Sequence, residues 1–214
     1  MELFVSLLGG MVTIMRIALG AWVLAVALGL VFALAMRSRF AVIRESVYFL
    51  TAALRGTPEL LLIYIVFYGL SGASGISLDP VSSVIVAVGV IYAGFAAEIY
   101  RSAFFTVPYS QVDAAHSLGL RSSKTMALVV LPLAGRFALA PLANLLLGLM
   151  KVATYGSAVG VAEVVYLATN DLQRTGNIAS TMFLIALIYV AVTLPISWGL
   201  RGLESKTRMG ELVS

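Results

Sequence analysis

The chain has 214 residues, of which 61% are hydrophobic and 11% are charged, and its mean hydropathy is +1.02. Soluble domains carry about 25% charged residues, so this composition excludes an ordinary soluble enzyme and predicts a membrane protein. The net charge is +4. In a membrane protein this positive excess is expected in cytoplasmic loops rather than on a nucleic-acid surface. The lack of cysteine and the single histidine exclude disulfides, thiolate chemistry and a histidine-rich metal site.

Uninterrupted uncharged runs predict five transmembrane helices, because a span needs about 20 apolar residues. In chain order the runs cover residues 17–36, 60–78, 81–97, 137–150 and 175–200. The third run continues past Glu98, and the fourth needs Lys151 and the next turn to cross the membrane. The runs are continuous, which favours helices over the alternating strands of a barrel. We therefore expect an all-α membrane protein in which residues 1–214 form a single transmembrane domain.

Basic residues predict the orientation, because lysine and arginine concentrate in cytoplasmic loops. With the N-terminus outside and the C-terminus in the cytoplasm, eleven basic residues fall on the inner side and only Arg16, Lys151 and Arg174 fall elsewhere. The external segment 156–174 is expected to hold a helix that lies across the outer ends of the spans.

The third loop, residues 101–135, is expected to carry a short cytoplasmic helix. Ser110 as N-cap and Asp113 at the third position fit a capping box, and Gly119 stands where a helix-ending glycine belongs. Val112, Ala115 and Gly119 share one face of small residues, which allows close approach to another surface. The pattern alone leaves two interpretations open: a helix that docks on a partner, or an interfacial helix that only links two spans.

The segment that follows resembles the EAA motif of the permease subunits of bacterial ABC importers. Residues 113–119 read Asp-Ala-Ala-His-Ser-Leu-Gly, and Leu-Pro follows at residues 131–132 with the spacing of that motif. Asp stands in place of Glu, and Val129 in place of Ile. The resemblance favours docking on an ATPase, and it implies coupling roles for six residues: Asp113, Ala114, Ala115, Gly119, Leu131 and Pro132.

Flanking motifs are similar to the permeases for polar amino acids, of the histidine/glutamine type. They include Arg-Gly-Thr-Pro at residues 55–58 and Ala-Glu-Ile-Tyr-Arg at residues 97–101. The resemblance implies a type I importer fold (MetI-like) in the bacterial inner membrane. It also implies two ATPase subunits, a second permease subunit, identical or paralogous, an external solute-binding protein and a polar amino acid as substrate.

The chain itself is not expected to be an enzyme or to hold a cofactor. Ser-Lys-Thr occurs at residues 123–125 and 205–207, but neither is preceded by the glycines of a phosphate-binding loop. ATP is therefore expected on a partner subunit. The alternative is an ion-coupled secondary transporter that acts without an ATPase, for which intramembrane carboxylates would be needed and only Glu98 is a candidate.

A polar cluster near the outer end of the fourth span is the candidate substrate path. A lysine inside the membrane usually faces a bundle interior or a water-filled path, although Lys151 could also extend to the outer headgroups. Residues 151–163 are similar to a Lys-Asp-Thr-Ser-Leu…Glu stretch of the family, with Val152 and Ala153 in place of two polar residues. The substrate path is assigned to four residues: Lys151, Thr154, Tyr155 and Glu163.

Two other polar groups have structural interpretations. Thr57 is expected to cap the second span, with Pro58 and Glu59 in its first turn. Glu98 and Arg101 are three residues apart and are expected to form an ion pair on one helix face.

Overall fold

The structure is a computed structural model that describes residues 2–70, 75 and 78–209. The described residues form helices and turns, and no strand occurs among them. The N-terminal helices are α1 (Glu2–Ala35), α2 (Ala41–Gly56), α3 (Glu59–Tyr64) and the π-helical η1 (Ile65–Gly69). The helices that follow are α5 (Pro80–Thr106), α6 (Tyr109–Ser117), α7 (Ser122–Thr125), the π-helical η2 (Met126–Val130), α8 (Leu131–Val152), the 3₁₀-helical η3 (Ala153–Val159), α9 (Val164–Thr175) and α10 (Ile178–Met209).

Four helical segments are long and apolar enough to cross a membrane: Leu3–Ala35, Pro80–Thr106, Ser122–Val159 and Ile178–Leu200. A fifth span is present if the bent pair formed by α2 and α3–η1 is counted as one. The expectation of an all-helical, multi-pass membrane protein is confirmed. The spans are longer than the uncharged runs suggested, since an arginine such as Arg16 is a good helix former and does not end α1.

The second span differs most from the prediction. We expected one helix over residues 60–78, but the structure bends by 101° between α2 and the helix α3–η1. Residues 71–74, 76 and 77 of the expected span lie outside the described part. Pro58, not Thr57, stands at the N-cap of α3. The Thr57 hydroxyl instead donates to the Ala53 carbonyl, 2.8 Å away, so this residue completes the end of α2.

Helices α1 and α5 form the central seam of the bundle, and small residues bring them close together. Gly20 faces Ile85, and Gly29 faces Ala96, so the two helices run in the same direction. A Cβ built on Gly29 would lie 2.5 Å from the Ala96 Cβ. Membrane helices pack through such small residues because lipid supplies little hydrophobic drive for association.

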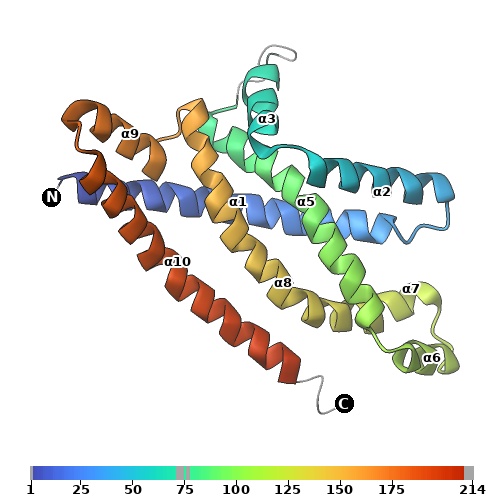
Figure 1. Cartoon of the computed structure of the whole chain (residues 1–214). Coiled ribbons are helices and arrows are strands. Elements are labelled where there is room, and N and C mark those ends of the chain that lie inside the picture. Colours follow the sequence, from blue (N-terminus) through green and yellow to red (C-terminus); the bar gives the residue numbers. More distant parts are fainter. Residues whose placement is uncertain (1, 71–74, 76–77, 210–214) are drawn as a thin grey trace.

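Helix α8 lies beside this seam and runs in the opposite direction (Figure 1). The Trp22 indole N–H donates to the Leu142 carbonyl at 2.7 Å, which joins α1 to α8. This hydrogen bond connects residues 120 positions apart in the sequence.

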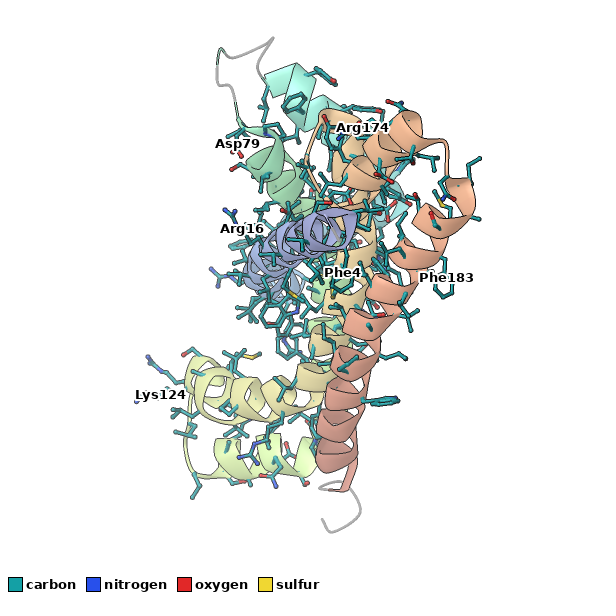
Figure 2. The ribbon with its side chains drawn as sticks, turned by 90° about the vertical axis from the view of Figure 1, so that its left-hand side faces the viewer. Phe4, Arg16, Asp79, Lys124, Arg174 and Phe183 are labelled. Atoms are coloured by element: carbon teal, nitrogen blue, oxygen red, sulfur yellow. The ribbon has the colours of Figure 1, made fainter. Side chains whose placement is uncertain are left out.

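The bundle has two ends, which we call the α6 end and the α9 end. Figure 1 shows α6 and α7 together at one end, and α9 beside the first turns of α1 and α10 at the other. In Figure 2 Lys124 lies at the α6 end and Asp79 and Arg174 at the α9 end, while Phe183 points outward from α10. The predicted helix in segment 156–174 is present as α9.

Candidate functional site

The segment from residue 101 to residue 135 contains less loop than the sequence suggested. Helix α5 continues to Thr106, and a continuous helical segment begins at Ser122. The part that leaves the bundle is therefore residues 107–121, with α6 at its centre. A short helix at this place was predicted and is found.

The expected capping box is wrong. Helix α6 begins at Tyr109, its N-cap is Pro108, and no side chain caps its first turn. Pro108 fixes the entry with φ −58° and ψ 132°, so Asp113 lies in the body of the helix. The C-terminal prediction is confirmed: Gly119 has φ +75°, and the Leu120 N–H donates to the Ala115 carbonyl at 3.2 Å, as in a Schellman ending.

The small-residue face of α6 is turned toward the chain itself. Ala115 is buried and Val112 packs against an apolar cluster that includes Phe104 and Val130. Gly119 lies beyond the end of the helix, not on this face. The expectation that Val112, Ala115 and Gly119 form a free docking face is therefore wrong.

The opposite face of α6 is open. Tyr109 is 77% exposed and Leu118 is 83% exposed, and Asp113 and Ala114 are also exposed. Large apolar side chains exposed beside polar ones mark interaction surfaces. We call this set of residues, Tyr109, Asp113, Ala114, Ser117 and Leu118, the α6 outer face.

The two other motif residues connect α6 to α8. Leu131 packs against the same apolar cluster as Val112, and Pro132 lies in the first turn of α8. The wider π-helical turns of η2 come immediately before Leu131. Such turns are often found at functional sites, and here they lie between the exposed helix and the long span.

The structure brings three of the four candidate path residues together. Lys151 is exposed in the last turn of α8, and Tyr155 is 42% exposed in the next turn. The Thr154 hydroxyl donates to the Lys151 carbonyl at 2.6 Å. Within the described residues Lys151 forms no ion pair, so its charge is available at the surface of this chain.

Glu163 has a different position from the other three. Its side chain is fully buried and N-caps α9, with its two carboxylate oxygens accepting from the Val165 and Tyr166 N–H groups at 2.9 Å. Burial raises the pKa of the Glu163 carboxyl, and these two hydrogen bonds partly oppose the rise. The expected contact of Glu163 with substrate is thus not supported by this arrangement, and its observed role is to position α9.

Glu163→Ala is expected to loosen α9, because the Val165 and Tyr166 N–H groups lose their buried acceptor. Losing a helix cap costs about 0.5–2 kcal/mol, and we expect a value near the upper end. Hydrogen exchange of the Val165 and Tyr166 amides in detergent should become faster. Glu45→Ala, which removes an exposed partner of Arg44, is the control; protection of α9 equal to that of the control would show that the cap contributes nothing.

A further polar group lies in the C-terminal half of α5. The Arg101 guanidinium pairs with Glu98, and Arg101 Nε donates to both carboxylate oxygens at 3.0 Å, which confirms the predicted ion pair. A cavity of about 460 Å³ opens beside this pair between α2, α5 and α8. Arg55 lines it, and sequence reasoning did not assign Arg55 to a site although it noted the Arg-Gly-Thr-Pro motif that begins there.

No group of three or more histidine, aspartate or glutamate residues is placed to hold a metal ion within residues 2–70, 75 and 78–209.

Comparison with known proteins identifies relatives over most of the chain. Residues 25–209 match the family described as "Binding-protein-dependent transport system inner membrane component". The L-cystine transport system permease protein TcyB of Bacillus subtilis is 32% identical over 156 residues, which are 73% of this chain and 66% of that protein. The chain thus spans just under two thirds of that relative. The histidine/lysine/arginine/ornithine transport system permease protein HisQ of Salmonella typhimurium is 31% identical over 74% of each chain.

Solved structures have the same fold. The crystal structure of an amino acid ABC transporter with histidines matches with a TM-score of 0.85 and 26% identity, over 96% of this chain and 94% of that chain. The inward-facing MetNI methionine ABC transporter matches with a TM-score of 0.75 over 93% and 95% of the two chains. Its identity is 18%, so this second likeness concerns the fold alone.

Proposed function

The chain belongs to the family of binding-protein-dependent transport system inner membrane components, and from this premise we propose that it is the permease subunit of an ABC importer for polar amino acids. The single observation that carries the proposal is the exposed α6 outer face, on a short helix whose other side packs onto the chain itself. Two ATPase subunits would bind there and at the same helix of a second permease subunit. A solute-binding protein would deliver the amino acid at the α9 end.

Coupling follows from the way α6 is attached. One side of the helix is packed onto the chain's own apolar cluster, so a force on its outer face is passed to the ends of α5 and α8. Nucleotide-driven movement of the ATPases would then shift these spans and alternate access between the two sides of the membrane. ATP hydrolysis would belong to the partner subunits, where the ATP is expected to bind.

The substrate path is assigned to Lys151, Thr154 and Tyr155 at the outer part of the bundle. The exposed ammonium and phenol lie within one turn of each other, where they would meet a zwitterion entering from the α9 end. The proposed orientation places the α6 end in the cytoplasm. Arg37 and Lys124 support it, because both lie at the α6 end, Arg37 5.5 Å from the Phe104 ring centroid, and cytoplasmic ends are rich in basic residues.

The test is reconstitution of the chain with its ATPases and solute-binding protein in vesicles, with uptake of labelled amino acids measured with and without ATP. Uptake that requires both ATP and the binding protein is the expected result. Uptake by this chain alone, driven by an ion gradient, would instead favour a secondary transporter. A reporter that is active only outside the membrane, fused after Ser214, should be silent.

A further inference from the structure

The apolar core of the bundle is divided into two clusters along its length. One cluster joins the first halves of α1 and α5 to the last turns of α8, and the other joins the second halves of α1 and α5 to the first turns of α8. We call them the α9-end cluster and the α6-end cluster. The boundary falls after Ala25 on α1 and between Phe95 and Ala96 on α5, while Leu145 of α8 packs against both clusters.

Helix α8 is the one of these three helices that has a proline near the boundary. Pro141 lies inside α8 and has no N–H, so the Phe137 carbonyl lacks its donor within the helix. A proline inside a helix is a usual place for a bend. Helix α1 contains no proline, and the proline of α5 is Pro80 in its first turn. A bend at the boundary is therefore easier in α8 than in its neighbours.

One hydrogen bond ties α8 to α1 directly after this proline. The Trp22 indole N–H donates to the Leu142 carbonyl at 2.7 Å. A carbonyl inside a helix already accepts from the N–H four residues later, so the Trp22 N–H is an additional donor. Leu142 is buried, and a hydrogen bond away from water is electrostatically stronger. The Trp22 side chain itself packs against the α9-end cluster.

We propose that Trp22 is a positioning residue for transport, which holds residues 142–152 of α8 on α1 while residues 131–140 bend away at Pro141. Residues 131–140 follow η2 and pack with α6 through the α6-end cluster, so they would follow a movement of the ATPases. Residues 142–152 carry Lys151 and continue into η3, and they would stay in place. This inference rests on the proposed function and adds which part of the span moves.

The bend would act on the cavity between α2, α5 and α8. Phe137, Pro141 and Leu145 line this cavity, so its wall includes the proline and one residue from each side of it. A bend at Pro141 changes the separation of Phe137 and Leu145, and with it the width of the cavity. Hinges of a few residues that absorb a large change are a known route to domain movement. Movement at α6 would thus open or close the cavity while the α9 end keeps its structure.

The first experiment measures the number of ATP molecules hydrolysed per amino acid imported, with the complex and its binding protein in vesicles. Trp22→Phe keeps an aromatic ring and removes the N–H. Loss of one hydrogen bond corresponds to about a two- to tenfold change in an equilibrium, and we expect the ratio to rise by about that factor at an unchanged level of assembled complex. Trp198→Phe is the matched control, since Trp198 is 65% exposed on α10, and it should keep the original ratio.

Pro141→Ala tests the bend. Alanine restores the N–H for the Phe137 carbonyl and stiffens α8, so uptake should fall although thermal stability in detergent is unchanged or raised. Pro195→Ala, inside α10, is the matched control and should import as the unaltered chain does. When α8 no longer bends, the Trp22 hydrogen bond has no moving part to separate from a fixed one. The effects of Trp22→Phe and Pro141→Ala should therefore not add in the double variant.

Distances between spin labels measure the movement directly, because the chain has no cysteine of its own. Leu19→Cys on α1 is paired with Leu128→Cys in η2 or with Asn144→Cys beyond the proline; all three residues are exposed. The labelled chain is diluted with unlabelled chain so that each complex carries one labelled copy. ATP should change the distance to residue 128 and leave the distance to residue 144 unchanged. In Trp22→Phe both distances should change.

Three results would overturn the proposal: equal changes of both distances in the unaltered complex, an unchanged ratio of ATP to amino acid in Trp22→Phe, or additive effects in the double variant. If Trp22→Phe fails to assemble, the two distances in the unaltered complex decide. Lack of any ATP-dependent import by the unaltered complex would refute the proposed function instead.

Discussion

Gly119→Val is expected to stop uptake while the chain remains folded in the membrane. Gly119 has φ +75°, a conformation that costs a residue with a side chain about 1–2 kcal/mol, and a β-branched residue more. A Cβ there would meet nothing within 4 Å, so the effect comes from the backbone and not from a clash within this chain. Helix α6 would lose its Schellman ending, and the α6 outer face would tilt away from the ATPase.

The strain corresponds to roughly a tenfold fall in the population of the native α6 geometry. We expect uptake and ATPase co-purification to fall together by about that factor or more, at an unchanged membrane level of the chain. Gly119→Asn should recover most of the activity, since asparagine tolerates this conformation. Gly135→Val is the matched control, because Gly135 lies in α8 and also has open space around it. Full uptake in Gly119→Val would remove the structural argument for docking at α6.

Gly29→Val is expected to remove the folded protein from the membrane. A Cβ on Gly29 would lie 2.5 Å from the Ala96 Cβ and 2.9 Å from the Ala97 backbone nitrogen. Backbone atoms of α5 cannot move aside as a flexible side chain can, so α1 and α5 must separate along their seam. Overpacking costs typically about 1–3 kcal/mol, and we expect at least the upper value here because two additional methyl groups follow the Cβ.

The measurement is the amount of chain recovered from membranes and its thermal unfolding in detergent. Gly9→Val is the matched control, since Gly9 is in the same helix but has nothing within 4 Å of a built Cβ. The control should be recovered at the level of the unaltered chain. Equal recovery of Gly29→Val and Gly9→Val would show that the α1–α5 seam is looser than the structure indicates.

Hydropathy predicted the membrane class and the approximate spans because a residue's preference for lipid or water is a local property. The uncharged run predicted the start of α5 to within one residue, at 81 against Pro80. The structure adds the cap: the Asp79 carboxylate accepts from the Ser82 N–H at 3.3 Å. Hydrogen bonding to Ser82, first through its side chain and then through its backbone N–H, lowers the pKa of the Asp79 carboxyl. Helix α2 was missed because Arg44 and Arg55 interrupt its apolar residues, and the 101° break depends on how α3 packs against α5.

In the candidate site, too, features set by the local sequence were predicted and features set by tertiary packing were missed. Gly119 was assigned correctly because a helix-ending glycine depends on its own backbone conformation. The direction of Ala115 was assigned wrongly, since periodicity shows that residues share a face but not what covers that face. The role of Glu163 was also missed, because its partners are backbone N–H groups of Val165 and Tyr166 that any sequence would supply.

The sequence by itself determined that this protein is a helical membrane protein with a short exposed helix near residue 113, because apolar runs and turn residues act over a few neighbouring positions. Only the tertiary structure decided which side of α6 is free and which polar groups share the central cavity. Arg55, Glu98 and Phe137 come from three helices separated by about 40 residues each. The approach of Arg55 to α5 is allowed by Gly94, and no local sequence pattern around any of the three residues predicts that they meet.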